Sequence, residues 1–340
     1  MEHRTLGHTG IRVSSLALGT MMFGAWGNTD HAECERTIHQ ALDAGINLVD
    51  TADMYADGET EEITGKALVG RRDDVVLATK FWNPMGPGVN QRGASRGWIT
   101  QAVEGSLRRL GTDWIDLYQV HRPDPHVDIA EFMGAMGDLV RQGKVRAIGT
   151  STWPAEMLVE AQWAADRAHL PRLASEQPPY SIFTRGVETA VLPTARRHGI
   201  GVVVWAPLNG GWLTGKYRKG QALPIGSRGE YASDHFQVNA AKYDAAEALL
   251  ALASQAGMSL THLALSWVRE HPAVTAAIIG PKTPEQLTDL LAGDHVRLGQ
   301  DVLDAIDAIV PPGTNLSDAD AGWTTWELDA ERRRRRSVAW

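Results

Sequence analysis

INLVDTADMY, residues 46–55, is the stretch that decides the fold of this chain. It opens with a mostly apolar run, which predicts a short buried strand. Asp50 ends that strand, and Tyr55 follows five residues later. Two further apolar runs, VVLATK and IDLYQVH, end in Lys80 and His121. The carboxyl ends of such strands carry the chemistry in α/β barrels, so we expect an acid/base set on one rim.

Apolar runs of this kind recur along the chain and alternate with helical patterns. Most are rich in Val, Ile and Leu without polar alternation, as is typical of strands buried on both faces. The expected strands are 16–20, 46–50, 75–80, 115–121, 145–150, 174–177, 201–206 and 275–280. The expected helices are 31–45, 60–69, 98–111, 128–142, 155–167, 187–198, 240–256, 259–270 and 284–292. Eight strand–helix units predict a closed (β/α)8 TIM barrel, preceded by a small hairpin over 3–13.

Length and composition agree with this fold. The 340 residues suffice for one barrel of about 250 residues with insertions, and no linker divides them, so we expect a single domain with its core over 7–310. The net charge of −8 disfavours nucleic acid or an anionic membrane as a partner. The single cysteine, Cys34, excludes an intrachain disulfide. No apolar run reaches the ~18 residues of a membrane span, so we expect a soluble, cytoplasmic protein.

Two segments depart from the repeating pattern. Residues 209–238 form a long, Gly-rich loop after the seventh strand, and loops of this length are usually functional or mobile. The tail 311–340 carries three tryptophans and an arginine run. We expect Arg332–Arg336 to be a solvated end. Trp323 and Trp326 either pack on the barrel or close over its mouth, and the sequence leaves both alternatives open; Trp340 ends the chain.

The residue types at the strand ends suit proton transfer to an oxygen atom. A tyrosine phenol has a reference pKa of ~10, too high for easy proton exchange at neutral pH. A nearby ammonium group favours the phenolate and lowers that pKa. Asp50 would hold Lys80 charged and oriented, and His121 would hydrogen-bond a substrate oxygen beside Tyr55. The set predicts a proton donor for a carbonyl oxygen that gains negative charge.

Each of these residues also has an ordinary structural interpretation. Asp50 fits a turn acceptor, and Tyr55 fits a half-buried aromatic. Lys80 fits a surface charge, and His121 fits a turn histidine. The functional interpretation depends on all four standing at equivalent positions on consecutive strands. A tuned proton donor for a carbonyl also needs a hydride, which no side chain supplies, so a nicotinamide cofactor is implied.

The set Asp50, Tyr55, Lys80 and His121 resembles the catalytic tetrad of the aldo-keto reductase superfamily. LVDTADMYADGETEEITGKAL, LGTDWIDLYQVHRPDP, GKVRAIGTS and GVVVWAPLNGGWLTGKY also resemble that family's stretches, and the resemblance runs over about 7–293. The nearest branch is that of bacterial reductases related to potassium-channel β-subunits. Those subunits commonly carry Asn in place of His121, so the histidine favours an active enzyme. The superfamily ranges from monomers to large rings, which leaves a homo-oligomer open.

The resemblance implies NADPH as the cofactor and carries a binding site onto this chain. Lys282 with Thr283 at a helix start is a reasonable site for the 2′-phosphate, which favours NADPH over NADH. The implied site consists of Thr20, Met21 and Asp50 at the nicotinamide, Ser151 and Gln177 at its carboxamide, Trp205 on its face, Ala206, Pro207, Leu208, Gly210, Lys216 and Arg228 along the pyrophosphate, and Gly280, Lys282, Thr283, Gln286 and Asp289 at the adenosine end. A small-molecule carbonyl compound is the expected substrate. Phe23, Trp26 and Trp82 lie just beyond strands and are either pocket walls or core residues.

Three other functions deserve comparison with carbonyl reduction. GGWLTGKY nearly matches a nucleotide-triphosphate loop, but Tyr217 stands where Ser or Thr is required and no helix pattern follows. HRPDPHVD, residues 121–128, offers possible metal ligands, yet it fits a turn before a helix, and no HExxH motif occurs. A regulatory module that binds NADPH with little turnover is the best alternative. We therefore expect an NADPH-dependent aldehyde or ketone reductase that uses no metal.

Overall fold

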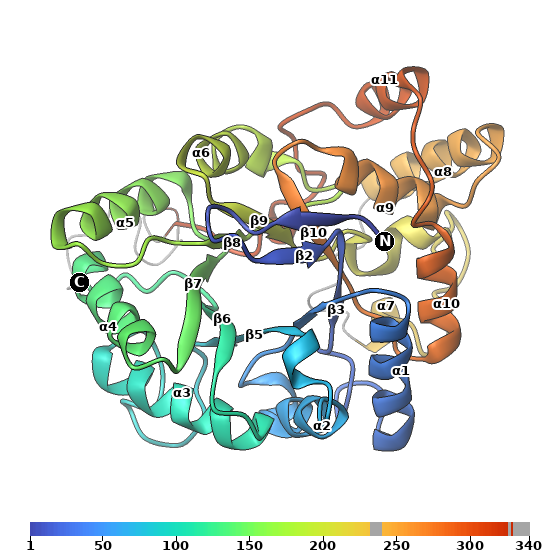
Figure 1. Ribbon diagram of the computed structural model, residues 1–340. Coiled ribbons are helices and arrows are strands. Elements are labelled where there is room, and N and C mark those ends of the chain that lie inside the picture. The colour runs from blue at the N-terminus through green and yellow to red at the C-terminus, as the bar shows by residue number, and fades with distance from the viewer. Residues whose placement is uncertain (232–239, 326–327, 329–340) are drawn as a thin grey trace.

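The computed structural model describes residues 1–231, 240–325 and 328. Eight parallel strands form a closed barrel, in which β10 pairs with both β9 and β3 (Figure 1). The strands are β3 (Leu16–Gly19), β4 (Leu48–Asp50), β5 (Val76–Phe81), β6 (Ile115–Val120), β7 (Val145–Ser151), β8 (Ser175–Gln177), β9 (Gly201–Val204) and β10 (Val274–Ile279). All eight expected strands occur, which confirms the (β/α)8 barrel. The seventh ends earlier than expected, because Ala206 has a left-handed backbone (φ 54°) that extended strands do not adopt.

A hairpin precedes the barrel, as expected. β1 (His3–Thr5) and β2 (Arg12–Ser14) pair antiparallel and lie across the barrel strands (Figure 1). Leu6 and Val13 of this hairpin are fully buried and pack against side chains from the strands. The hairpin therefore closes the amino end of the barrel and leaves the carboxyl end as its mouth.

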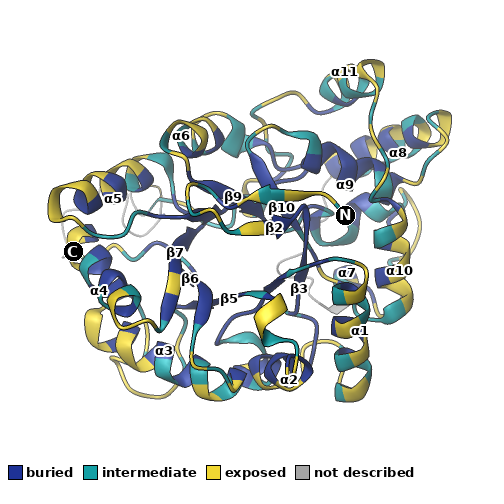
Figure 2. Cartoon of the chain, viewed as in Figure 1, coloured by how far each residue is buried: buried dark blue, intermediate teal, exposed yellow. Residues whose placement is uncertain are grey.

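Helices surround the barrel and turn their polar faces outward (Figure 2). They are α1 (His31–Asp43), α2 (Glu59–Ala67), α3 (Arg96–Leu110), α4 (Ile129–Arg141), α5 (Ala155–Ala168), α6 (Val191–His198), α7 (Arg228–Tyr231), α8 (Ala240–Gln255), α9 (Leu260–Glu270), α10 (Pro284–Ala292) and α11 (Gln300–Ile309). Side chains cap several helix starts; Asp128, for example, accepts hydrogen bonds from the first free N–H groups of α4. No single helix among the described residues is long and apolar enough to cross a membrane; α8 and α9 reach that length and composition only as a pair bent by 92°.

The sequence did not lead us to expect α11. Its apolar residues Val302, Ile306 and Ile309 recur at helical spacing, but eight strand–helix units were already complete without it. Helix α6 is shorter than the expected 187–198, because a separate 3₁₀ turn, Gly186–Glu188, precedes it. The 209–238 loop contains a 3₁₀ turn, Asn209–Thr214, and α7, while its residues 232–238 lie outside the described part.

The barrel interior has two layers, because side chains on a strand alternate between its faces. The amino-end layer is apolar and draws one residue from each strand or its start: Ala17, Leu48, Ala78, Leu117, Ala147, Ala174, Val203 and Ala276. Two residues after Leu48 and Ala78 stand Asp50 and Lys80. The second layer is therefore polar, although Asp50 and Lys80 are 3% and 1% exposed.

Candidate active site

The Lys80 ammonium group links the side chains at the mouth. Its Nζ donates to Asp50 Oδ1 at 2.5 Å, to Thr51 O at 2.8 Å and to Tyr55 Oη at 3.3 Å. Burial alone would lower the pKa of Lys80, but attraction to Asp50 and then to Tyr55 outweighs burial and raises that pKa above its ordinary value. Lys80 therefore stays charged at neutral pH. The other Asp50 oxygen, Oδ2, accepts from Gln177 Nε2 at 2.8 Å.

Tyr55 is positioned by an unusual turn. It begins the 3₁₀ turn η1 (Tyr55–Gly58), in which Ala56 and Asp57 have left-handed backbones with φ of 47° and 53°. Non-glycine residues in this conformation are uncommon and occur often at functional sites. The Tyr55 ring lies 5.9 Å from both the Trp26 and the His121 ring centroids.

His121 is held as a neutral ring. It is 7% exposed, and burial, followed by the charges of Lys80 and Arg122, lowers its pKa well below the ordinary value. The amide nitrogen of Asn83 lies 3.2 Å from His121 Nδ1. A neutral ring that accepts this hydrogen bond at Nδ1 carries its proton on Nε2. His121 can then donate from Nε2 to an oxygen.

Backbone strain gathers at the same rim. Trp82 directly follows β5 and Thr152 directly follows β7, with φ of 140° and 61°, and Ala206 lies two residues after β9. Such conformations cost roughly 1–3 kcal/mol each, and their clustering favours a functional mouth.

The residues expected at a nicotinamide lie on neighbouring strand ends. Ser151 ends β7 and Gln177 ends β8, and Ser151 Oγ donates to Gln177 O at 2.9 Å. Gln177 Oε1 has no hydrogen-bond partner among the described residues, so it can accept one from a ligand amide. Trp205 is half-buried beyond β9, where its face can cover a planar ring. Thr20 is fully buried and donates to Asp50 O at 3.1 Å, so we assign it a supporting role.

The expected phosphate-binding residues follow β9 and β10. Gly210, Gly211 and Gly215 have φ of 65°, 99° and 78°, a conformation that glycine adopts without strain. Lys216 is exposed, and no helix follows it until Arg228 begins α7, which differs from a nucleotide-triphosphate loop. Half-buried Met21 and Ala206, buried Pro207 and half-buried Leu208 are the remaining residues of this set near the strand ends.

The adenosine end corresponds to the start of α10. Thr283 caps this helix, and its Oγ1 accepts from Gln286 N at 3.4 Å. Gln286 Oε1 in turn accepts from Lys282 N at 2.8 Å. Gly280 and Asp289 are exposed on the same segment. Lys282, Thr283 and Gln286 therefore lie together at the start of α10, where the positive end of the helix dipole favours a phosphate, while Asp289 lies further along the helix beside His262.

The three aromatic residues expected at the substrate differ in exposure. Trp26 is 41% exposed and faces the Tyr55 ring, which suits a pocket wall. Trp82 is half-buried. Phe23 is fully buried in the core between strands and helices, which favours core packing over a place in the pocket wall. No group of three or more His, Cys, Asp or Glu side chains in the described residues is arranged to hold a metal ion.

Part of the C-terminal tail lies against the mouth. A Cβ atom placed on Gly322 would lie 2.7 Å from Trp205 Cζ2 and 3.3 Å from Thr152 Cγ2. Asp320 fixes this segment, because its Oδ2 pairs with Lys242 Nζ at 2.6 Å. The half-buried Trp323 follows Gly322 directly. Trp326, Arg332–Arg336 and Trp340 lie outside the described residues.

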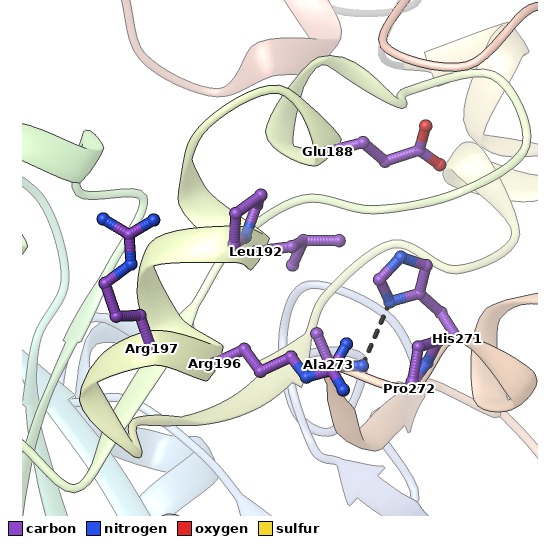
Figure 3. A pocket seen from close by; sticks show the side chains of 8 residues that line it. Glu188, Leu192, Arg196, Arg197, His271, Pro272 and Ala273 are labelled. Atoms are coloured by element: carbon purple, nitrogen blue, oxygen red, sulfur yellow. Dashed lines mark hydrogen bonds between the residues drawn. The ribbon is translucent and has the colours of Figure 1, made fainter.

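A separate hollow of about 550 Å³ lies away from the mouth (Figure 3). Leu192, Arg196 and Arg197 of α6 line one side, and His271 and the residues after it line the other. His271–Ala273 precede β10, so this side belongs to the amino end of the barrel. His271 Nδ1 accepts a hydrogen bond from Ala273 N at 3.2 Å, as the dashed line in Figure 3 marks. None of the residues expected at the active site borders this hollow.

Sequence reasoning missed two residues near the reacting atoms. Asn83 contacts His121, and Arg122 donates from Nη1 to His121 O at 2.6 Å. Both stand directly beyond a strand end, Asn83 two residues after β5 and Arg122 two residues after β6. Their position on the rim was therefore a usable signal, whereas their contacts depend on side-chain conformations.

Comparisons with known proteins identify the family. The model of the aldo/keto reductase family matches residues 15–311. The uncharacterized oxidoreductase YrpG of Bacillus subtilis is 40% identical over 334 residues, which cover 94% of this chain and 100% of that protein. A probable voltage-gated potassium channel subunit beta of Arabidopsis thaliana is 38% identical, covering 91% and 97%, and the aldo-keto reductase YhdN of B. subtilis is 40% identical, covering 85% and 88%. This chain therefore belongs to the aldo/keto reductase family.

Proposed function

We propose that this protein reduces aldehydes or ketones to alcohols with NADPH. The observation that carries the proposal is the Lys80 ammonium group, which contacts Asp50 and Tyr55 inside a buried site. A cation that touches a phenol oxygen stabilises negative charge on it, which is the property a proton donor needs. Relatives described as oxidoreductases support the same reaction class.

The residues of the mouth fit a nicotinamide dinucleotide. Gln177 offers an acceptor to an amide, Trp205 offers a flat face, and the start of α10, beside Lys282, offers the positive end of a helix to a phosphate. When bound, NADPH would supply the hydride for the carbonyl carbon. The protein itself has no group that can do so.

The side chains of this chain handle the proton. Tyr55 donates its phenolic proton to the carbonyl oxygen, and Lys80 stabilises the phenolate that remains. Asp50 keeps Lys80 charged and oriented. His121, neutral and protonated on Nε2, donates a hydrogen bond that orients the same oxygen. The carbonyl carbon gains a hydride and the oxygen gains a proton, which gives the alcohol.

A regulatory module that binds NADPH with little turnover is the second candidate. It is favoured by the 38% identity to a probable channel subunit beta. His121 argues for the enzyme, because its pKa is lowered and its ring is oriented by Asn83, a preparation that cofactor binding alone does not require. A 340-residue single domain, a cytoplasmic location and a homo-oligomer are compatible with either candidate.

The test compares wild type with Tyr55→Phe. Loss of NADPH absorbance is followed with a panel of aldehydes and ketones, and NADPH binding is measured separately. Phenylalanine keeps the ring between Trp26 and His121 but removes the proton, so we expect turnover to fall about 10²- to 10⁴-fold while NADPH binds nearly as well. Equal turnover would exclude Tyr55 as the proton donor. Binding without turnover in wild type would favour the regulatory module.

A second variant tests the cofactor preference. Lys282→Ala removes a cation beside the capped start of α10. We expect it to weaken NADPH about tenfold or more while NADH binding changes little, because only NADPH carries the 2′-phosphate. Lys219→Ala, at an exposed cation earlier in the chain that pairs with Asp244, is the control. Equal weakening of both cofactors would remove the 2′-phosphate assignment.

A further inference from the structure

Arg122 brings a second positive charge to the mouth of the barrel. It follows His121 at the end of β6, and its Nη1 donates to His121 O at 2.6 Å and to Thr152 Oγ1 at 3.3 Å. Its guanidinium carbon lies 5.9 Å from the centroid of the Trp205 ring. The side chain therefore reaches from β6 past the end of β7 and points towards Trp205, beside the tail at Gly322.

This charge has no counter-ion among the described residues. The Asp50 carboxylate on the same rim is already paired with Lys80. The oxygens of Glu176 accept from Thr150 Oγ1 and from Trp153 N, and burial raises the pKa of Glu176 to about 7, so its negative charge is incomplete at neutral pH. A half-buried guanidinium without a carboxylate is costly, which calls for an anion that the protein does not supply.

The unused part of the guanidinium is shaped for a carboxylate. Only Nη1 is engaged, whereas Nε and Nη2 have no hydrogen-bond partner among the described residues. These two nitrogens share one edge of the planar group and form a fork that can donate to both oxygens of a carboxylate. Other arginines that are at least half-buried form ion pairs: Arg185 pairs with Asp307, and Arg269 pairs with Asp294.

Arg122 lies beside the proposed reacting groups, because it follows His121 directly in the chain. The Arg122 charge lowers the pKa of His121. Burial lowers the pKa of Arg122 itself, and the Tyr55 oxygen offsets part of that lowering. We propose that Arg122 binds a carboxylate carried by the substrate, so that the preferred substrates are aldehydes or ketones bearing a carboxylate group. This inference rests on the proposed carbonyl reduction. It goes further by naming a substrate class and the residue that selects it.

The experiment uses a matched pair of substrates, 4-carboxybenzaldehyde and its methyl ester, together with the 2- and 3-carboxy isomers. The acid and ester have similar size but differ in charge, and their different ring electronics affect wild type and variants alike. The readout is the ratio of kcat/KM for acid over ester with NADPH, in wild type, Arg122→Met, Arg122→Lys and the exposed-cation control Arg108→Met. The ratio cancels any general effect of the substitution on folding or on His121.

We expect wild type to prefer at least one acid over the ester about tenfold or more. Arg122→Met should lower that ratio about 10- to 100-fold, mainly through KM, because a charge-assisted hydrogen bond of this kind is worth about 1.5–3 kcal/mol. Arg122→Lys should keep part of the preference, and Arg108→Met should keep all of it.

Other outcomes would overturn the inference in distinguishable ways. A ratio that does not change in Arg122→Met would show that Arg122 does not select the carboxylate, while the proposed reduction would stand. A tenfold weaker NADPH affinity in Arg122→Met, with an unchanged ratio, would assign Arg122 to the cofactor instead. If wild type reduced neither substrate nor any other carbonyl compound, the proposed function itself would fail.

Discussion

The two layers of the barrel interior are built from the same strands but do different work. Leu48 and Asp50 lie on β4, and Ala78 and Lys80 lie on β5, so each strand places an apolar residue and then a charged one on the same face. The offset of two positions along each strand separates the layers by roughly 6–7 Å. The amino-end layer is closed by the hairpin, whereas the carboxyl-end layer opens to the mouth. The amino-end part of each of these strands therefore contributes to packing, and its carboxyl end contributes to the candidate active site.

The layers also differ in their expected effect on stability. The apolar layer removes hydrocarbon from water, which is the main favourable term in folding. The Lys80–Asp50 pair has to lose its hydration first, and a buried pair of this kind often contributes little or even costs stability. The comparison predicts that substitutions in the apolar layer change stability alone. Substitutions in the polar layer change turnover, and they change stability as well where they leave a buried charge unpaired.

The largest effect is expected from Lys80→Met. Methionine fills a similar volume but leaves the buried Asp50 carboxylate without a cation, so stability should fall by about 3–5 kcal/mol. Turnover should fall about 10²- to 10⁴-fold, because Tyr55 loses the charge that stabilises its phenolate. Urea unfolding and the NADPH absorbance assay measure the two quantities.

The double variant Asp50→Asn with Lys80→Met sharpens this test. It removes both charges, so we expect it to recover most of the lost stability while remaining inactive. A double variant as unstable as the single one would mean that the pair stabilises the fold by itself. Recovered activity would contradict the proposed role of Lys80.

Leu117→Ala tests the opposite layer. Leu117 is fully buried and lies on β6, the strand that leads to His121. Removing its side chain should cost about 2–5 kcal/mol through lost burial and the cavity left behind. We expect kcat/KM per folded molecule to stay within about threefold. The division between layers would break down if Leu117→Ala lowered turnover as strongly as Lys80→Met.

The sequence predicted much of this arrangement because the fold repeats. Eight buried runs without alternation indicated a parallel barrel, and the carboxyl ends of such strands meet at one rim. Knowing that Asp50, Lys80 and His121 end their strands was therefore enough to bring them together. The expected boundaries differ by one or two residues at most strands, since strand ends depend on local backbone angles such as that of Ala206.

The parts that the sequence did not predict depend on side-chain direction and on neighbouring segments. Asn83 and Arg122 are ordinary polar residues after strands, and only their contacts with His121 distinguish them. Phe23 was indistinguishable from Trp26 by type and spacing, yet one is buried and the other faces Tyr55. No local pattern indicates that Gly322 packs on Trp205, because that contact joins residues 117 positions apart.

A smaller effect, on the pH dependence of stability, is expected at Asp53, a buried carboxyl group just beyond the end of β4. Asp53 donates its N–H to Lys80 O at 3.0 Å, and its fully buried carboxyl group has no hydrogen-bond partner among the described residues. Burial, followed by repulsion from Glu61, raises the pKa of Asp53 well above its ordinary value, although Arg109 opposes the shift. We therefore expect a neutral Asp53 in the folded protein at pH values where it is ionised in the unfolded chain.

This raised pKa fixes the sign of a pH effect. Stability from a group with a raised folded pKa is present below the unfolded pKa of ~3.9 and is lost as pH rises through the folded pKa, by ~1.4 kcal/mol per pH unit between the two. Asp53→Asn removes the titration, so its advantage over wild type in urea unfolding should grow from pH 5 to pH 7. Asp113→Asn, at an exposed site, is the matched control. If the Asp53→Asn slope equals that of wild type, Asp53 is already ionised in the folded protein. The charged groups of the site would then include Asp53 as well as Asp50 and Lys80.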